Sequence, residues 1–276
     1  MTPLSTPGQE PGTPGTGSAG GATAECHIWS LPPLPRPADW FRFLDSDELA
    51  RCSAYLHELD LARFVTGRVL ARSALGLLCG MEPESVRLRT RCPGCGGAHG
   101  KPQALGPAAR WEFSITHSGD VVAVGVTEGL PIGLDVEQLL DPETPPESGM
   151  PPEHELVLTA EERATLLLLP REQRAPGFMT YWTRKEAVLK ATGEGLNTPM
   201  HSFAVTGPDR APALIGTAGG GEGRPDHGAG GPACRAQLVL ADLDPGPGYR
   251  GAVAVLGAGA VRVRMRPGTE LTAPRG

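Results

Sequence analysis

Two carboxylates stand two residues apart in segment 131–137, which reads Pro-Ile-Gly-Leu-Asp-Val-Glu. The apolar residues of this segment recur at every second position, a pattern that predicts a β-strand. Because side chains alternate between the two faces of a strand, Asp135 and Glu137 lie on the same face, roughly 6–7 Å apart. Two like charges at this spacing repel each other unless a cation or a proton neutralises one of them. The pair therefore predicts a cation site.

A third carboxylate and two lysines follow in segment 182–190, Trp-Thr-Arg-Lys-Glu-Ala-Val-Leu-Lys, which we predict to be helical. Residues four apart stack on one side of a helix, so Trp182, Glu186 and Lys190 share a side that Lys185 adjoins. A helix that crosses the strand brings three carboxylates and two lysines together. Oxygen ligands of this kind suit Mg²⁺, which usually takes one or two carboxylates and completes its shell with water and phosphate oxygens. The residues alone predict phosphoryl transfer.

These two segments, in this order and about 45 residues apart, resemble the paired signature of the 4′-phosphopantetheinyl transferases. The second segment continues as Ala-Thr-Gly at 191–193, and a Phe-Ser-Ile-Thr-His-Ser-Gly run precedes both segments at 113–119. The length of the chain and the order of its motifs resemble the surfactin-synthetase-activating type. The resemblance covers roughly residues 25–257.

The resemblance implies an α+β fold of two similar α/β halves, related by a pseudo-two-fold axis, with the active site between them. It also implies a holo-[carrier protein] synthase type of activity. Such an enzyme moves the 4′-phosphopantetheine arm of coenzyme A to a serine of an apo acyl or peptidyl carrier protein and releases 3′,5′-ADP. The carrier proteins of the family serve fatty-acid, polyketide and nonribosomal peptide synthesis.

Site residues follow from the resemblance, position by position. Asp135, Glu137 and Glu186 are expected to hold Mg²⁺, and Glu186 and Lys190 to act in catalysis. Glu186 is either the base that takes the serine proton or a metal ligand that reaches the serine through a water on the metal. The residues expected to bind coenzyme A are Arg63 at the 3′-phosphate, Lys101 beside the adenine, His117 at the phosphates, and Lys185 and Lys190 at the diphosphate.

Other polar residues lie near these positions in the sequence. The family run usually has Asn and Ser where this chain has Ser114 and Thr116, and Thr116 keeps the hydroxyl donor. A helix is predicted from about Leu59 to Gly80, and two further arginines lie on it. We expect Arg68 on a solvated face, and we leave Arg72 open between a structural and a functional role.

A second cluster of candidate ligands is Cys92, Cys95 and His99, whose spacing is typical of zinc sites. A closed zinc site needs four ligands, and no second pair follows, so a tight loop with free cysteines is the favoured interpretation. Two alternative functions remain open. One is a Mg²⁺-dependent phosphohydrolase that uses the same carboxylates, and the other is a non-enzymatic interaction protein built on the zinc loop.

Composition limits the class of protein. A net charge of −6 argues against a general nucleic-acid binder, which normally has a basic face. The amino terminus lacks the basic and apolar regions of a secretory signal, and no stretch has the roughly 20 apolar residues that cross a bilayer. We expect a cytoplasmic monomer with reduced thiols and without membrane or nucleic-acid partners.

The chain divides into four parts by composition and by resemblance. Residues 1–24 are rich in Gly, Pro, Ser and Thr and are predicted to be disordered. An N-terminal half is expected at 25–137 and a C-terminal half, which carries the signature helix, at 138–257. Residues 258–276 are expected to be a dispensable tail.

Overall fold

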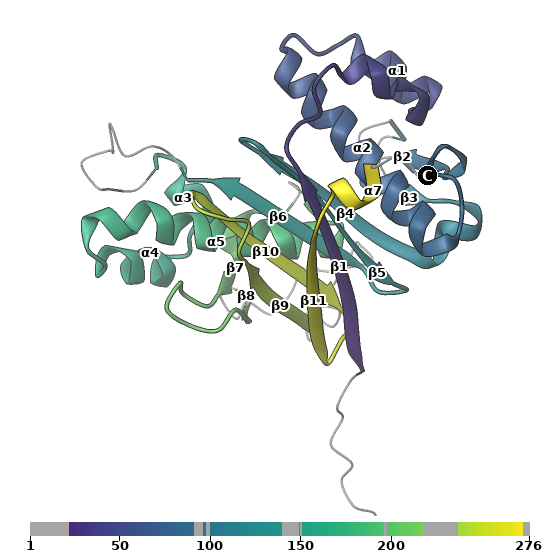
Figure 1. Ribbon diagram of the computed structural model, residues 1–276. Coiled ribbons are helices and arrows are strands. Elements are labelled where there is room, and N and C mark those ends of the chain that lie inside the picture. The colour runs from purple at the N-terminus through teal and green to yellow at the C-terminus, as the bar shows by residue number, and fades with distance from the viewer. Residues whose placement is uncertain are drawn as a thin grey trace, which may run out of the picture.

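Two β-sheets form the centre of this α+β chain and meet along strands β4 and β6 (Figure 1). The structure is a computed structural model that describes residues 22–90, 96–97, 100–139, 149, 151–195, 198–217 and 237–272. Helix α2 lies against one sheet, with α1 beyond its far end, and helices α3, α4 and α5 lie beside the other sheet (Figure 1). The α+β class expected from the sequence is confirmed.

The first sheet contains strands from both ends of the described chain. Its order is β11 (Ala260–Pro267), β1 (Thr23–Leu31), β5 (Val121–Glu128) and β4 (Trp111–Ser118). Strand β1 runs parallel to β11 and antiparallel to β5. Strands β4 and β5 form the predicted hairpin, whose turn uses Gly119 at φ +53°, a conformation that favours glycine.

The second sheet is antiparallel, in the order β6 (Ile132–Gln138), β10 (Tyr249–Leu256) and β9 (Leu238–Leu243). Two small antiparallel pairs lie outside these sheets: β2 (Leu88–Thr90) with β3 (Pro102–Ala104), and β7 (Phe203–Val205) with β8 (Leu214–Thr217). The helices are α1 (Ser46–Cys52), α2 (Glu58–Cys79), α3 (His154–Val157), α4 (Ala160–Leu167), α5 (Arg171–Thr192) and α7 (Thr269–Thr272).

Each large sheet is covered by one 22-residue helix, α2 on the first and α5 on the second. Helix α5 passes directly over β6 because Gly133 has no side chain. A Cβ atom at Gly133 would overlap the backbone O of Ala187 and the backbone N of Ala191. This close approach brings the signature helix onto the strand that carries the two carboxylates.

The tail predicted at the end of the chain needs correction. Strand β1 lies inside the first sheet because β11 pairs along it. The predicted tail at 258–276 therefore contains a sheet strand. The boundary expected after Glu137 stays a prediction, although β6, which precedes it, pairs with β10 of the second sheet. The signature helix, predicted over 182–190, begins at Arg171 and includes Pro176 in its second turn.

Candidate active site

The two sheets are joined at β4 and β6 by side chains instead of a backbone ladder. Three hydroxyls on alternate residues of β4 accept hydrogen bonds from three backbone N–H groups of β6: Ser114 from Leu134 (3.0 Å), Thr116 from Val136 (3.3 Å) and Ser118 from Gln138 (3.0 Å). We call these three residues the hydroxyl ladder. Because buried backbone N–H groups need partners, the ladder fixes β6 beside β4.

Asp135 lies beside this ladder and is only 2% exposed. Its Oδ1 accepts a hydrogen bond from Lys190 Nζ at 2.6 Å and another from the Thr116 hydroxyl at 3.2 Å. Its Oδ2 is buried and has no hydrogen-bond partner among the described residues. A buried carboxylate oxygen without a partner is costly, so this atom marks a place where a cation would be stabilising.

Glu137 leaves β6 on the same face as Asp135, as its spacing predicted. The Ser118 hydroxyl donates to Glu137 Oε2 at 2.6 Å. Burial raises the pKa of Glu137; the Ser118 hydrogen bond opposes that rise, and the negative charge of Asp135 adds to it. The ionised form of Glu137 is therefore disfavoured, by burial and by the negative charge of Asp135.

Glu186 reaches the same neighbourhood from α5. Burial raises the pKa of Glu186, the ammonium of Lys190 opposes this, and the charges of Asp135 and Glu137 raise it further. The negative charges of the three predicted carboxylates are therefore close enough to interact. Within the described part of the chain, however, no group of three or more His, Cys, Asp or Glu side chains is arranged so that it could hold a metal ion.

The donor set still fits Mg²⁺ in its chemistry, although the side chains do not converge into a cage. The ligands offered are oxygens, Asp135 Oδ2 has no partner, and the mutual repulsion of the carboxylates would be relieved by a divalent cation. Lys190 supplies the positive charge instead, through its contact with Asp135.

Two further predicted residues lie at the β4–β5 turn. Arg63 on α2 donates to the backbone O of Gly119 from Nε (3.0 Å) and Nη2 (2.8 Å), and pairs with Asp60 at 3.0 Å. His117 reaches solvent, yet the protein packed around its ring lowers its pKa, and the charges of Arg63 and Lys190 lower it further. The fold thus collects positive charge from α2 and α5 around the end of β4.

Lys101 has a different position from the one expected of a free phosphate ligand. Its Nζ donates to the backbone O of Ile132 (2.7 Å) and of Lys190 (3.1 Å), and burial lowers its pKa. Lys101 therefore links β6 to the end of α5 through the backbone O atoms of Ile132 and Lys190. Its predicted contact with the adenine end of the coenzyme stays a prediction.

The structure places Lys185 differently from the position predicted for it. Its side chain is fully buried and forms an ion pair with Glu162 at 2.6 Å. It also donates to the backbone O atoms of Val157, Met200 and Phe203 at 2.8–2.9 Å. An ammonium group enclosed in this way, with all its contacts to α3, Glu162 and the segment 200–203, is not placed to meet a diphosphate. The sequence carried a signal, because Lys185 lies four residues from both Tyr181 and Leu189 on the apolar stripe of the helix.

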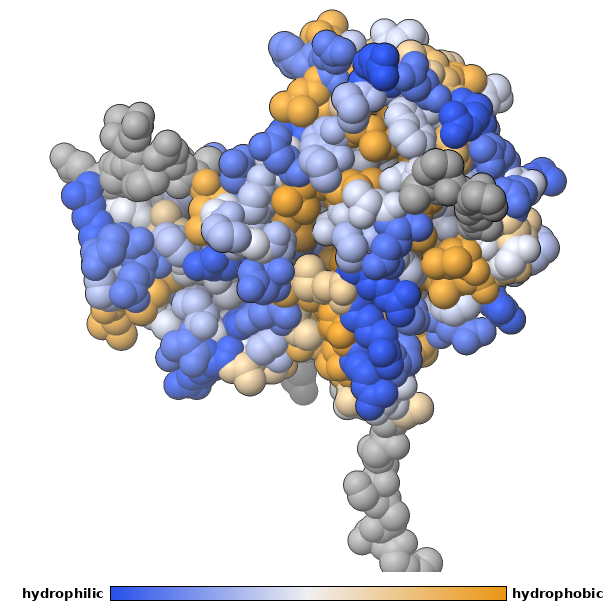
Figure 2. All heavy atoms as spheres, in the orientation of Figure 1, coloured by the Kyte–Doolittle hydropathy of each residue, from blue (hydrophilic) through white to orange (hydrophobic). Residues whose placement is uncertain are grey.

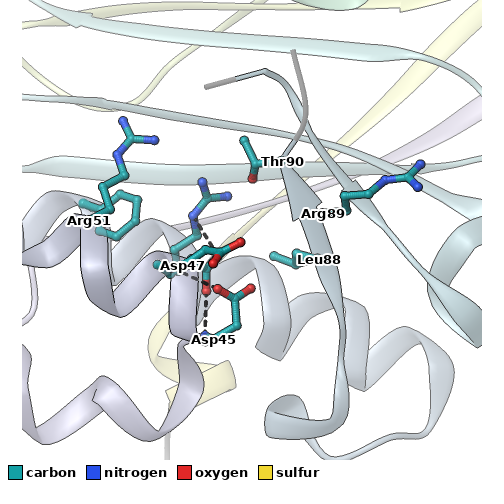
Figure 3. Close-up of a pocket in the computed structure, with 9 residues that line it drawn as sticks. Asp45, Asp47, Arg51, Leu88, Arg89 and Thr90 are labelled. Carbon is teal, nitrogen blue, oxygen red and sulfur yellow. Dashed lines mark hydrogen bonds and ion pairs between the residues drawn. The ribbon is translucent and has the colours of Figure 1, made fainter. Parts of the chain in front are cut away.

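The other two arginines of α2 are structural. Arg68 pairs with Glu48 at 3.1 Å and Arg72 with Glu48 at 2.7 Å, and this buried cluster fixes α1 to α2. Arg68 is only 7% exposed, so the solvated face expected for it is wrong. Figure 3 shows the pocket of about 150 Å³ beside the cluster, which Arg51, Arg89 and neighbouring residues of α1 and β2 also line. None of the predicted site residues lines it.

The zinc candidates Cys92, Cys95 and His99 lie outside the described residues. The described cysteines Cys26, Cys52 and Cys79 are free thiols. The ladder hydroxyls, of which Thr116 and Ser118 contact the carboxylates, are a feature that the sequence analysis did not connect with Asp135 and Glu137. Their signal was polar residues on alternate positions of an otherwise apolar hairpin.

Known proteins resemble the chain in the region that builds this site. The family model described as the 4′-phosphopantetheinyl transferase superfamily matches residues 131–231. The 4′-phosphopantetheinyl transferase HetI of Nostoc sp. is 34% identical over 178 residues, which are 62% of this chain and 70% of the relative. The chain belongs to the 4′-phosphopantetheinyl transferase superfamily. The family predicted from the paired motifs is confirmed.

Two Bacillus subtilis proteins add to the superfamily match. The 4′-phosphopantetheinyl transferase Sfp is 28% identical and ffp is 27% identical, each over 163 residues that span 59% of this chain and 66% of the relative. Among solved structures, the holo-[acyl-carrier-protein] synthase of Thermotoga maritima has a TM-score of 0.31 and 22% identity, over 47% of this chain and 64% of that chain. That likeness is too small to support an argument about this fold. In the described part of this superfamily member, no helix has both the length and the apolar character needed to cross a membrane.

Proposed function

We propose that the chain transfers the 4′-phosphopantetheine arm of coenzyme A to a serine of an apo acyl or peptidyl carrier protein, with Mg²⁺ as cofactor. The observation that carries this proposal is the meeting of Asp135, Glu137 and Glu186 with Lys190 in a member of this superfamily. Asp135 and Glu137 would hold the ion, and Glu186 would either complete the ligand set or take the serine proton. Mg²⁺ supplies positive charge to the diphosphate oxygens when it is bound.

The chemical step is the one that the resemblance implies. The serine oxygen forms a bond to the phosphorus that carries the pantetheine arm, and the bond from this phosphorus to 3′,5′-ADP breaks. The leaving 3′,5′-ADP keeps the bonding electrons, and the serine proton passes to a base. Glu186 is our candidate, because burial raises its pKa toward the range in which a carboxylate accepts a proton well. Lys190, Arg63 and His117 would bind the phosphates of coenzyme A.

We also propose the division into two similar halves that the resemblance implies. Its support is that α2 and α5 have the same length, each covers one sheet, and each ends at a left-handed glycine, Gly80 at φ +66° and Gly193 at φ +73°. The hydroxyl ladder comes from the first sheet, and the carboxylates come from the second sheet and α5. One chain then supplies both sides of the site, as a monomeric enzyme requires.

Intact-mass analysis of an apo carrier protein tests the proposed activity. The protein is incubated with coenzyme A and Mg²⁺, and we expect the carrier to gain the mass of one phosphopantetheine arm while 3′,5′-ADP appears. Asp135→Asn should abolish the mass gain of the carrier and keep the circular dichroism of the folded protein. Glu128→Gln, at an exposed position, should leave the mass gain unchanged. Full transfer by Asp135→Asn would refute the metal assignment. No transfer to carriers of fatty-acid, polyketide or peptide type would refute the activity.

A further inference from the structure

Two hydroxyls of the ladder have a second contact that the third lacks. Thr116 and Ser118 each accept from the backbone of β6 and also donate to a carboxylate, Thr116 to Asp135 Oδ1 at 3.2 Å and Ser118 to Glu137 Oε2 at 2.6 Å. Ser114 accepts from β6 in the same way, and no contact of Ser114 with a carboxylate occurs among the described hydrogen bonds.

This double contact fixes the direction of each carboxylate. A hydroxyl has one donor and two acceptor sites, so an N–H that occupies one acceptor site restricts where its own hydrogen can point. In both cases the N–H comes from the residue directly after the carboxylate. Each hydroxyl therefore contacts both a backbone N–H and the neighbouring carboxylate of β6, and this double contact limits the rotation of the carboxylate.

The same contact determines which oxygen is left for a ligand. Both donors to Asp135, Lys190 and Thr116, bond to Oδ1, while Oδ2 is buried and has no partner among the described residues. Ser118 likewise bonds to a single oxygen of Glu137. Asp135 is thus held by one oxygen, so that the other can serve a cation. Glu137 is held by Ser118, with the Trp182 side chain also in contact.

We propose that Thr116 and Ser118 are positioning residues that orient Asp135 and Glu137 for Mg²⁺. The proposal rests on the proposed function, because Mg²⁺ is the ion of that site. Hydrogen bonds to the ligands of a metal typically change its affinity by about 10- to 100-fold when they are removed. The junction between the sheets alone does not explain the pattern, because Ser114 forms the same junction without a carboxylate.

Ser114 supplies a matched control for the experiment. Thr116→Val, Ser118→Ala and Ser114→Ala each remove one hydroxyl and leave one N–H of β6 without its partner. Mg²⁺ is titrated calorimetrically into each variant, alone and with saturating coenzyme A, in the absence of carrier protein so that no transfer occurs. Urea unfolding of the metal-free proteins measures the structural cost of each change.

We expect Thr116→Val and Ser118→Ala to weaken Mg²⁺ binding by about 10-fold or more. Ser114→Ala should bind Mg²⁺ within about 2-fold of the unmodified protein, and Thr116→Ser, which restores a hydroxyl, should recover most of the affinity. The urea midpoints of Ser114→Ala and Thr116→Val, whose bonded N–H groups are buried, should fall by similar amounts, and that of Ser118→Ala, whose bonded N–H of Gln138 is exposed, should fall less.

Either of two results would overturn the proposal: Mg²⁺ affinity that falls equally in all three deletion variants, or affinity that changes in none of them. Absence of Mg²⁺ binding by the unmodified protein, with and without coenzyme A, would overturn it as well. The transfer assay on the unmodified protein tests the proposed function independently of Mg²⁺ affinity. Transfer that persists while the three variants bind Mg²⁺ alike would remove the positioning role and leave the activity standing.

Discussion

Lys185 and Lys190 lie five residues apart on α5, yet their ammonium groups serve different parts of the molecule. Lys190 contacts Asp135 at the junction of the sheets, and Lys185 contacts Glu162 in the core between the second sheet and its helices. The sequence motif contains both lysines and does not say which faces the site. At the scale of single residues, the face from which a side chain leaves its element decides its role.

The buried pair predicts a stability effect for Lys185→Met. The change leaves Glu162, whose side chain is 4% exposed, without its counter-ion, and breaking such a pair typically costs about 3–5 kcal/mol. The free energy of unfolding in urea should fall by about this amount. The double variant Lys185→Met with Glu162→Gln should lose less, because no charge is then left alone. Unchanged stability with weakened binding of coenzyme A would instead restore the ligand role first predicted for Lys185.

The raised pKa of Glu186 predicts a pH dependence of stability. A carboxyl whose pKa rises on folding binds its proton more tightly in the folded chain, so unfolding releases protons. The free energy of unfolding therefore falls as pH rises from the ordinary value of 4.5 through the raised pKa. Glu186→Gln removes this loss. In metal-free protein it should raise the stability relative to the unmodified chain at pH 7 and not at pH 4, as measured by urea unfolding.

Mg²⁺ provides the control for the Glu186 prediction. Added at pH 7, the ion should stabilise the unmodified protein more than Glu186→Gln, since it neutralises the repulsion that the variant has already lost. A Glu186→Gln protein that is less stable than the unmodified chain at pH 7 without metal would contradict the shared electrostatic environment of the three carboxylates.

At the scale of elements, local patterns predicted well and long-range pairing did not. The hairpin of β4 and β5, the end of α2 at Gly80 and the capping box between Thr159 and Glu162 all follow from residues a few positions apart. The partner of β6 is β10, more than a hundred residues later, and no local pattern specifies it. The pair Asp135 and Glu137 could be predicted because strand alternation is local; the burial of Lys185 depends on α3 and β7.

The contact of α5 with β6 predicts a large effect of Gly133→Ala. The added Cβ meets backbone atoms of Ala187 and Ala191, so the helix itself has to move, at a typical cost of about 1–3 kcal/mol. Because α5 carries Glu186, transfer activity should fall together with the urea midpoint. Gly125→Ala on β5 is the matched control, since its Cβ meets the flexible end of Ile132 at 3.1 Å. Equal effects of the two changes would argue against the close passage of α5 over β6.

At the scale of the whole molecule, the first sheet is closed by strands from the two ends of the described chain. Strand β11 pairs with β1 over eight residues, from Thr23 with Ala260 to Ser30 with Pro267. Its outward face is polar, and Figure 2 shows a hydrophilic strip where β1 and β11 lie in Figure 1. Exposed Arg262 and Arg264 pair there with Glu25. This polar, alternating face explains why the sequence suggested a tail: only Val261 and Val263 offer apolar contacts to the core.

Deletion of residues 258–276 should therefore destabilise the protein, contrary to the dispensable tail predicted from the sequence. It removes a ladder whose hydrogen bonds each contribute about 0.5–1.5 kcal/mol, and it exposes β1 as an unprotected edge that can pair with other chains. We expect a lower urea midpoint and aggregation in size-exclusion chromatography. Deletion of residues 273–276 alone, which keeps β11 and α7, should change neither measurement. A monomeric 1–257 protein with the stability of the full chain would show that the pairing of β11 with β1 contributes nothing to the fold.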